Sequence, residues 1–217
     1  MTRPLAIFDL DNTLLDRASA FTGWATDFVH RHGLDPAELA WLTQADGDGF
    51  ASRSGFVAAL VERYGLPGSA PELLREFRAG IVERAELFPG TVAGLRRLTD
   101  AGWLVAIATN GATAQQWAKI RRHRLAEQVH AVAVSEEVGA VKPEPLIFET
   151  AAARCGVGLD PTHWMVGDCP TRDIGGAAAL GLRTLWMRRG RTWDATLPAP
   201  TASAETVTDA VAILLGR

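Results

Sequence analysis

The sequence is poor in cysteine, which argues against a thiolate metal centre and against a disulfide-stapled fold. Among 217 residues only Cys155 and Cys169 are cysteines, and they form neither a metal-ligand spacing nor a disulfide framework. Reduced thiols are the ordinary state of cysteines in a cytoplasmic protein. We therefore expect a cytoplasmic location.

An excess of positive charge and long apolar runs are also missing. The formal net charge is -3, whereas a nucleic-acid partner calls for a basic face. No apolar run approaches the length of a membrane span, and residues 1–10 lead into a predicted strand instead of a signal peptide. We expect no nucleic-acid partner, no membrane association, and a monomer or small homo-oligomer.

Strand and helix patterns alternate over the second part of the chain. Strands are predicted at Leu5–Phe8, Trp103–Ala108, Ala131–Val134, Trp164–Val166 and Arg183–Met187, and Leu197–Ser203 is predicted to be a loop. Helices of ten or more residues between such strands imply a parallel sheet covered on both faces. The pattern predicts an α/β fold.

Residues 16–86 show helical patterns without a strand between them. Apolar side chains with a helical period begin at Phe21, and three further helices are predicted, with a polar loop over Thr43–Gly55. Trp24 and Trp41 are expected in the core of this insert. We predict two domains, a four-helix domain of residues 16–86 and a core of residues 1–15 and 87–217.

Polar residues follow the predicted strands directly. Asp9 and Asp11 come after the first strand, Thr109 and Asn110 after the second, and Asp168 after the fourth. Parallel α/β sheets bind ligands beyond the carboxyl ends of their strands. We therefore expect these side chains at one site, joined by Lys142, which comes a few residues after the third strand.

This set of residues suits the cleavage of a phosphate monoester. Asp9 can attack phosphorus and form an aspartyl-phosphate, which divides one difficult displacement into two easier ones. Asp9, Asp168 and Asp173, with a backbone carbonyl near Asp11, form an all-oxygen ligand set that suits Mg²⁺ and not zinc.

Three further residues complete the predicted chemistry around the phosphoryl group. Lys142 adds a positive charge, while Thr109 and the Asn110 amide offer hydrogen bonds to the phosphoryl oxygens. Asp11 is expected to lie among carboxylates and to hold a proton. It would give this proton to the leaving alcohol and later take one from the attacking water.

Each motif alone has a plainer interpretation. A Gly-Asp or Thr-Asn-Gly sequence often forms a turn, and a single lysine before a proline is usually a surface residue. The basic side chains of Lys119, Arg121, Arg122 and Arg124 are expected on the solvated face of a helix. The order of the motifs at successive strand ends favours the functional interpretation.

The motifs together resemble those of the haloacid dehalogenase (HAD) superfamily. The four signatures stand at Asp9–Thr13, Thr109-Asn110, Lys142-Pro143, and Gly167-Asp168 with Asp173. The resemblance implies a Rossmann-like core, Mg²⁺ dependence, Asp9 as nucleophile and Asp11 as acid/base. It also implies that the helical insert is the cap of subfamily I, the group that includes phosphoglycolate phosphatases and phosphomutases.

Details of the first and fourth motifs refine the resemblance. Asp11 indicates a phosphatase, because the dehalogenases of this family lack an acid at that position. The Thr13 hydroxyl is expected to tie down the turn after the first strand. Asn12 and Cys169 stand where the family often has Gly and Ser, and they leave the subclass open.

The sequence leaves the substrate and part of the function open. The segment Asp46–Arg53 is the candidate for contacting the leaving group, and Arg53 would bind a second anionic group of the substrate or make a salt bridge instead. A phosphatase acting on a small phosphorylated metabolite is the leading hypothesis. A phosphomutase of the same family, or a non-catalytic binding or regulatory protein on this scaffold, are the alternatives.

Overall fold

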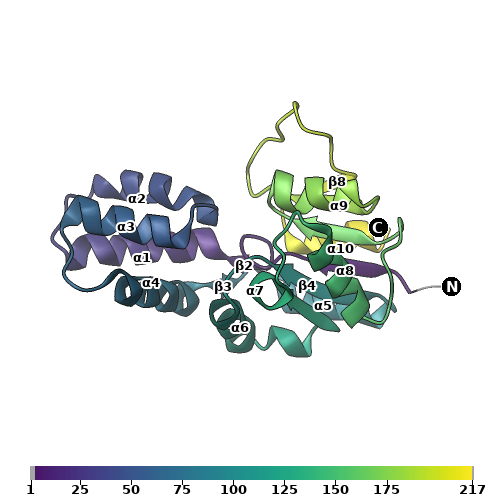
Figure 1. Cartoon of the computed structure of the whole chain (residues 1–217). Helices are drawn as coiled ribbons and strands as arrows, with labels where there is room; N and C mark the ends of the chain where they lie inside the picture. Colours follow the sequence, from purple (N-terminus) through teal and green to yellow (C-terminus); the bar gives the residue numbers. More distant parts are fainter. Residues whose placement is uncertain (1–2, 217) are drawn as a thin grey trace. The chain divides into compact units, whose positions relative to one another are not determined.

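The chain forms two compact units in a computed structural model that describes residues 3–216 (Figure 1). One unit is Asp16–Glu86, and the other combines Met1–Leu15 with Leu87–Arg217. The two connecting segments are short strands, β2 (Leu15–Asp16) and β3 (Glu86–Leu87), which pair with each other. Over the described residues, no helix has the length and apolar character needed to cross a membrane.

The larger unit is built on a six-stranded parallel sheet with the order β5-β4-β1-β6-β7-β8. Its strands are β1 (Leu5–Phe8), β4 (Leu104–Thr109), β5 (Ala131–Val134), β6 (Trp164–Gly167), β7 (Arg183–Met187) and β8 (Ala202–Ala204). The chain runs outward from β1 through β4 to β5, then returns to the other side of β1 for β6. Such a reversal opens a crevice at the carboxyl ends of the central strands. The predicted α/β fold is confirmed.

Alternate side chains of β1 pack into different cores on the two faces of the sheet. Leu5 and Ile7 join one apolar cluster, while Ala6 and Phe8 join the other, as the two-residue period of a strand requires. The first cluster is covered by α8 (Pro145–Arg154) and α9 (Gly176–Ala179). The second is covered by α5 (Thr91–Asp100), α6 (Thr113–Arg122) and α10 (Val207–Leu214). Burying a side chain such as Phe8 contributes about 1.5–3 kcal/mol to stability.

The sheet has one strand more than the sequence predicted. β8 pairs with β7 through Ala202, Ser203 and Ala204, whereas Leu197–Ser203 was expected to be a loop. The loop prediction is confirmed for residues 197–201 and wrong for Ala202 and Ser203, because a three-residue edge strand with small side chains has no apolar pattern to reveal it. Its backbone hydrogen bonds to β7 make it a strand.

The smaller unit consists of helices around an aromatic core. Its helices are α1 (Arg17–Arg31), α2 (Glu38–Asp46), α3 (Arg53–Tyr64) and α4 (Ala70–Arg84). Trp24 lies in this core, stacked on Phe28 with a centroid distance of 5.1 Å and edge-on to Phe77 at 4.8 Å. Trp41 is partly buried and packs against the same cluster.

The polar loop predicted over Thr43–Gly55 is shorter than expected. α2 continues to Asp46, a short 3₁₀ turn η1 follows over Gly47–Gly49, and α3 already begins at Arg53. The prediction relied on the polar composition, in which aspartate is typical of a loop. In the structure Asp46 ends α2 and is buried in an ion pair with Arg17.

Gly176, at the start of α9, permits a close approach to the segment that carries Lys142. A Cβ atom on Gly176 would lie 2.7 Å from the Pro143 Cβ and 2.9 Å from its Cα. Because the second of these atoms belongs to the backbone, it cannot move aside easily. We expect Gly176→Ala to lower the free energy of unfolding by about 1–3 kcal/mol, as overpacking does.

Urea denaturation of the purified variants measures this effect, with Gly158→Ala as the control. A Cβ on Gly158 meets no heavy atom within 4 Å, so the control should stay within about 0.5 kcal/mol of wild type. Equal stability of the two variants would contradict the prediction.

Candidate active site

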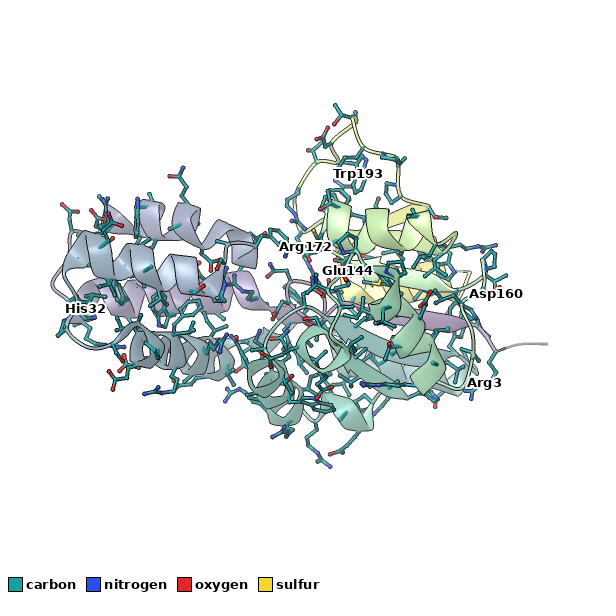
Figure 2. The ribbon with its side chains drawn as sticks, viewed as in Figure 1. Arg3, His32, Glu144, Asp160, Arg172 and Trp193 are labelled. Carbon is teal, nitrogen blue, oxygen red and sulfur yellow. The ribbon has the colours of Figure 1, made fainter. Side chains whose placement is uncertain are left out.

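The two ends of the sheet in the larger unit carry different segments. Arg3 and Asp160, which precede β1 and β6, lie at one end, while Glu144 and Arg172, which come after β5 and β6, lie toward the other (Figure 2). The predicted site residues of this unit follow strands, so they belong to the second end.

Three buried carboxylates converge at this carboxyl end. Asp9 directly follows β1, Asp168 directly follows β6, and Asp173 lies in η3 (Pro170–Gly175), a turn of π-helix. One oxygen of each residue lies within 4.8 Å of the others, and all three residues are buried. Carboxylates so close together repel one another unless positive charge lies among them.

The donor set fits a divalent cation that prefers oxygen ligands. All three candidate ligands are carboxylates, which suit hard cations such as Mg²⁺, Mn²⁺ or Ca²⁺ better than zinc. Asp173 is fixed in place, since its Oδ2 accepts a hydrogen bond from the Cys169 backbone N–H at 2.9 Å. Gly167 makes room for it, because a Cβ there would lie 2.4 Å from the Asp173 carboxyl carbon.

Lys142 supplies positive charge inside the cluster. Its Nζ lies 2.5 Å from Asp9 Oδ1 and 2.7 Å from Asp173 Oδ1, and it donates to the Ala108 carbonyl at 2.8 Å. The side chain is buried. Burial alone would lower the pKa of Lys142, but the two carboxylates outweigh burial and raise it.

The charge state of Asp9 depends on its burial and on the charges around it. Burial raises the pKa of Asp9 to about 7, with a further rise from Asp173 and Asp11 and an opposing effect of Lys142. A cation bound among these carboxylates favours the ionised form of Asp9, which is the form that can act as a nucleophile.

Asn110 holds the backbone of Lys142. Its Oδ1 accepts from the Lys142 N–H at 2.8 Å, and its Nδ2 donates to the Lys142 carbonyl at 3.0 Å. The next residue is anchored too, because the Gly111 N–H donates to Ser135 Oγ at 2.9 Å. With its side-chain amide used in this way, Asn110 can serve a phosphate through its backbone N–H.

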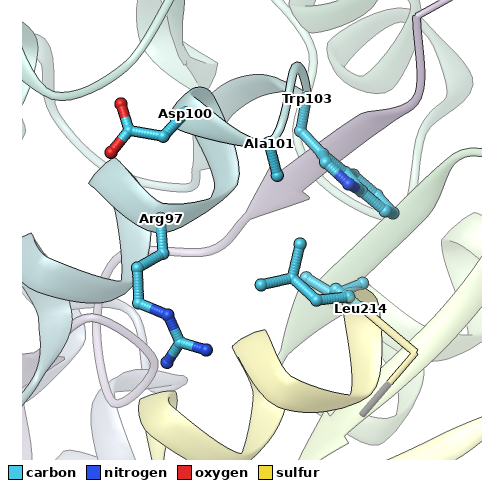
Figure 3. A pocket seen from close by; sticks show the side chains of 6 residues that line it. Arg97, Asp100, Ala101, Trp103 and Leu214 are labelled. Atoms are coloured by element: carbon cyan, nitrogen blue, oxygen red, sulfur yellow. The ribbon is translucent and has the colours of Figure 1, made fainter.

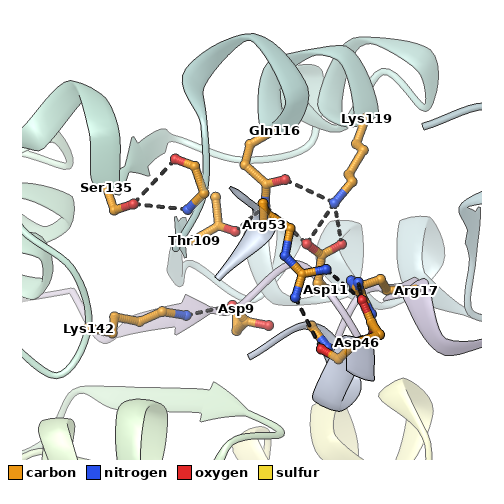
Figure 4. Close-up of polar contacts among 12 residues, drawn as sticks. Asp9, Asp11, Arg17, Asp46, Arg53, Thr109, Gln116, Lys119, Ser135 and Lys142 are labelled. Atoms are coloured by element: carbon orange, nitrogen blue, oxygen red, sulfur yellow. Dashed lines mark hydrogen bonds and ion pairs between the residues drawn. The ribbon is translucent and has the colours of Figure 1, made fainter. Parts of the chain in front are cut away.

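Asp11 pairs with a lysine, a contact that the sequence did not predict. Lys119 Nζ donates to Asp11 Oδ1 at 2.8 Å and to Oδ2 at 2.7 Å (Figure 4). Asp11 is not one of the three residues whose carboxylate oxygens converge, although its charge still acts on Asp9. Its backbone is the part that could contribute a metal ligand.

The solvated face predicted for α6 is wrong for Lys119. This residue is 1% exposed, whereas Arg121, Arg122 and Arg124 are exposed. The prediction failed because the sequence around Lys119 does not reveal its partner, an aspartate 108 positions earlier.

Gln116 links Asp11 to Thr109. Its Nε2 donates to Thr109 Oγ1 at 2.6 Å and to Asp11 Oδ2 at 3.2 Å, and its Oε1 accepts from Lys119 Nζ at 2.9 Å. Neither Gln116 nor Lys119 was predicted to be a site residue. One signal was available, since Lys119 and Lys142 are the only lysines in the chain, and both contact aspartates of the first motif.

The turn after β1 is held by an arginine and not by the Thr13 hydroxyl. Within the described residues, Thr13 Oγ1 has no hydrogen-bond partner. Arg189 instead donates to the carbonyls of Asn12 at 3.1 Å and Thr13 at 2.6 Å. The Arg189 guanidinium also stacks 3.4 Å from the centroid of Phe88, which packs its charge against a ring face.

Arg53 takes part in a buried ion cluster of the smaller unit. It donates to Asp46 Oδ1 at 2.5 Å, and Arg17 binds both carboxylate oxygens of Asp46 at 2.8 and 2.7 Å. Burial alone would raise the pKa of Asp46, but the two arginines outweigh it and lower this pKa. Contact of Arg53 with a substrate anion stays a prediction.

A separate cavity lies away from these residues. Its volume is about 560 Å³, and its lining includes Arg97 and Asp100 of α5, Trp103 and Leu214 (Figure 3). Trp103 directly precedes β4, so this cavity lies at the amino end of the sheet and holds none of the predicted site residues.

The elevated pKa of Asp9 predicts a pH-dependent stability. The pKa is about 7 in the folded, metal-free protein and 3.8 as the ordinary value, so the folded state binds the proton more tightly. The contribution of Asp9 to the free energy of unfolding should then fall as pH rises through this window, between about 4 and 7, and level off above it.

Urea denaturation in EDTA of wild type and Asp9→Asn, compared at each pH, measures this contribution. The stability of wild type relative to the variant should decrease with rising pH. An increase over the same range would contradict the assignment.

Three comparisons with known proteins bear on this geometry. A family model described as "haloacid dehalogenase-like hydrolase" matches residues 4–181. A phosphoserine phosphatase of Thermus thermophilus is 36% identical over 81% of this chain and 72% of its own length. A ribulose-1,5-bisphosphate 5-phosphatase of Halopiger xanaduensis is 31% identical over 94% of this chain and 92% of its own.

A solved structure supports the fold. The HAD-hydrolase YfnB from Bacillus subtilis, described as bound to magnesium, superposes with a TM-score of 0.83 at 23% identity and covers 99% of both chains. Together with the four motifs at the strand ends, the match to the family model leads to one conclusion. The chain belongs to the haloacid dehalogenase-like hydrolase family.

Proposed function

We propose that this protein is a Mg²⁺-dependent phosphatase that cleaves a small phosphorylated metabolite through an aspartyl-phosphate on Asp9. The observation that carries the proposal is the buried cluster of Asp9, Asp168 and Asp173 with the Lys142 ammonium on Asp9. The names of the relatives, which include phosphatases of small phosphorylated molecules, support the same substrate class.

The nucleophile and its charge compensation come from the strand ends. Asp9 would attack phosphorus as the bond from phosphorus to the leaving oxygen breaks, and a phosphorus–oxygen bond to Asp9 forms. Mg²⁺ held by Asp9, Asp168 and Asp173 would offset the negative charge of the phosphate. Lys142 contributes a fixed positive charge beside the same oxygens, where low exposure makes electrostatic stabilisation strong.

Thr109 and Asn110 are proposed to hold the phosphoryl oxygens. The Thr109 hydroxyl accepts a hydrogen bond from Gln116, so the hydrogen of this hydroxyl is free to point toward a phosphoryl oxygen. The Asn110 backbone N–H, on the next residue, is the second proposed donor. Donors held in place before the reaction stabilise the transition state without the cost of reorienting.

Asp11 is proposed as the acid and base. Because its carboxylate pairs with the Lys119 ammonium, Asp11 would first take up a proton from solvent. It would then give this proton to the leaving oxygen in the first step, and the alcohol would depart. In the second step it would take a proton from the water that attacks the phosphorus of the aspartyl-phosphate, releasing inorganic phosphate and restoring Asp9. The helical unit Asp16–Glu86 is proposed as the cap that selects the substrate, and the cytoplasm as the place of action.

Replacing the nucleophile tests the covalent mechanism. We expect Asp9→Asn to lower the release of phosphate from 4-nitrophenyl phosphate by at least about 10³-fold, because an amide cannot form the aspartyl-phosphate. Asp100→Asn, the same exchange at an exposed position of α5, should match wild type. Turnover by Asp9→Asn at the wild-type rate would remove the covalent mechanism.

Metal removal tests the proposed cofactor. Dialysis against EDTA should abolish turnover, and Mg²⁺ should restore it. The single charge of Lys142 cannot offset the carboxylates of Asp9, Asp168 and Asp173 together with a substrate dianion.

Product analysis separates hydrolysis from isomerisation. When the protein is incubated with a panel of phosphorylated metabolites, free phosphate should form in amounts equal to the dephosphorylated product. Isomers formed without free phosphate would show a phosphomutase instead.

A further inference from the structure

Helix α6 presents two polar side chains toward the proposed reaction site. Gln116 and Lys119 are three residues apart, so they lie on the same face of the helix. Both are about 1% exposed, and between them they contact Asp11 and Thr109 (Figure 4). The family motifs in the sequence include neither residue.

The burial of Lys119 has a physical cost that must be offset. An ammonium removed from water costs several kcal/mol unless it is paired and its hydrogens are bonded. Lys119 uses its donors on both carboxylate oxygens of Asp11 and on Gln116 Oε1. Because the chain otherwise uses arginine for positive charge and has only two lysines, a compact ammonium at this position is a specific feature.

The hydrogen bonds of Gln116 and Lys119 form an ordered chain. Gln116 Oε1 accepts from Lys119, which fixes the Gln116 Nε2 as the donor to Thr109 Oγ1 and Asp11 Oδ2. The Thr109 hydroxyl, already accepting, donates its own hydrogen elsewhere. One helical turn therefore sets both the orientation of the Asp11 carboxylate and the direction of the Thr109 hydroxyl.

We propose that Lys119 and Gln116 are positioning residues that hold Asp11 for proton transfer to the leaving oxygen. Their effect is to specialise the site for phosphate monoesters of aliphatic alcohols. This inference rests on the proposed phosphatase function and deepens it.

The leaving oxygen explains why the positioning matters for this substrate class. An aliphatic alkoxide is a poor leaving group that needs a proton as its bond to phosphorus breaks, whereas 4-nitrophenolate leaves without one. When Asp11 gives up its proton, the Lys119 ammonium stabilises the carboxylate that remains. The proton moves from Asp11 to the alcohol, and Lys119 keeps its own protons throughout.

The test compares kcat/KM for two kinds of leaving group in Lys119→Met. The probes are 4-nitrophenyl phosphate and the best aliphatic substrate among glycerol 3-phosphate, phosphoserine and phosphoglycolate. Since a well-placed general acid contributes about 10²–10⁴-fold, we expect a loss of about 10²-fold on the aliphatic substrate and of less than about 3-fold on the aryl substrate. Equal losses on both would overturn the proposal, since general damage to the site predicts them.

Two further variants act as controls. Arg121→Met removes a basic side chain from the exposed side of the same helix, where Arg121 lies over the Trp117 ring, and it should match wild type on both substrates. Lys119→Arg keeps the positive charge and should restore part of the aliphatic activity.

A double-mutant comparison shows whether Lys119 acts through Asp11. In an Asp11→Asn background, Lys119→Met should cost no further kcat/KM on the aliphatic substrate, because the proton donor is already gone. Multiplying losses would show an independent role and overturn the proposal. Asp11→Asn alone should also lower the melting temperature by leaving a buried ammonium without its counter-ion, and adding Lys119→Met should raise it again.

Folding and the proposed function can be separated in the same experiments. If Lys119→Met does not fold, Gln116→Leu removes the three hydrogen bonds of Gln116 without removing the cation. Since Thr109 serves both substrates, some loss is expected on each, and the loss on the aliphatic substrate should be about 10-fold larger than on the aryl substrate. Wild type that releases phosphate from no probe would overturn the phosphatase function itself. Wild type that cleaves the aryl ester but none of the three aliphatic esters would overturn only the proposed specialisation.

Discussion

The close approach of buried carboxylates at the end of β1 is the constraint on which the site depends. Asp9, Asp168 and Asp173 place carboxylate oxygens within 4.8 Å of one another in a region with little access to water. Such an arrangement calls for positive charge nearby, which Lys142 supplies and the proposed divalent cation would add. The surrounding structure serves this purpose, since Asn110 fixes the backbone of Lys142, and Gly167 and Gly176 leave space for Asp173 and Pro143.

Two lysines give the two aspartates of the first motif separate environments. Lys142 contacts Asp9 within the acidic cluster, while Lys119 turns the Asp11 side chain toward α6. Two carboxylates only two residues apart can then take different parts in one reaction, one as a proposed nucleophile and the other as a proposed acid and base. Environment, and not residue type, distinguishes them.

Helices and strands could be predicted from the sequence where the local pattern of apolar residues was strong. The run Leu5–Phe8 and the helical period around Trp24 were sufficient for a strand and a helix that the structure contains. β8 was missed because its three small residues carry no apolar alternation. The continuation of α2 to Asp46 was missed because the partners that bury this carboxylate, Arg17 and Arg53, lie 29 and 7 positions away.

The sequence by itself determined the parallel α/β core, since strands that alternate with helices have few ways to bury both faces of a sheet. It also indicated which polar residues follow strands and so gather at one edge. Only the tertiary structure decided the partners of those residues: Lys119 on Asp11, the Asn110 amide on Lys142, and Arg189 on the turn after β1. Side chains that pair across 32 to 176 positions depend on packing, which the local sequence does not record.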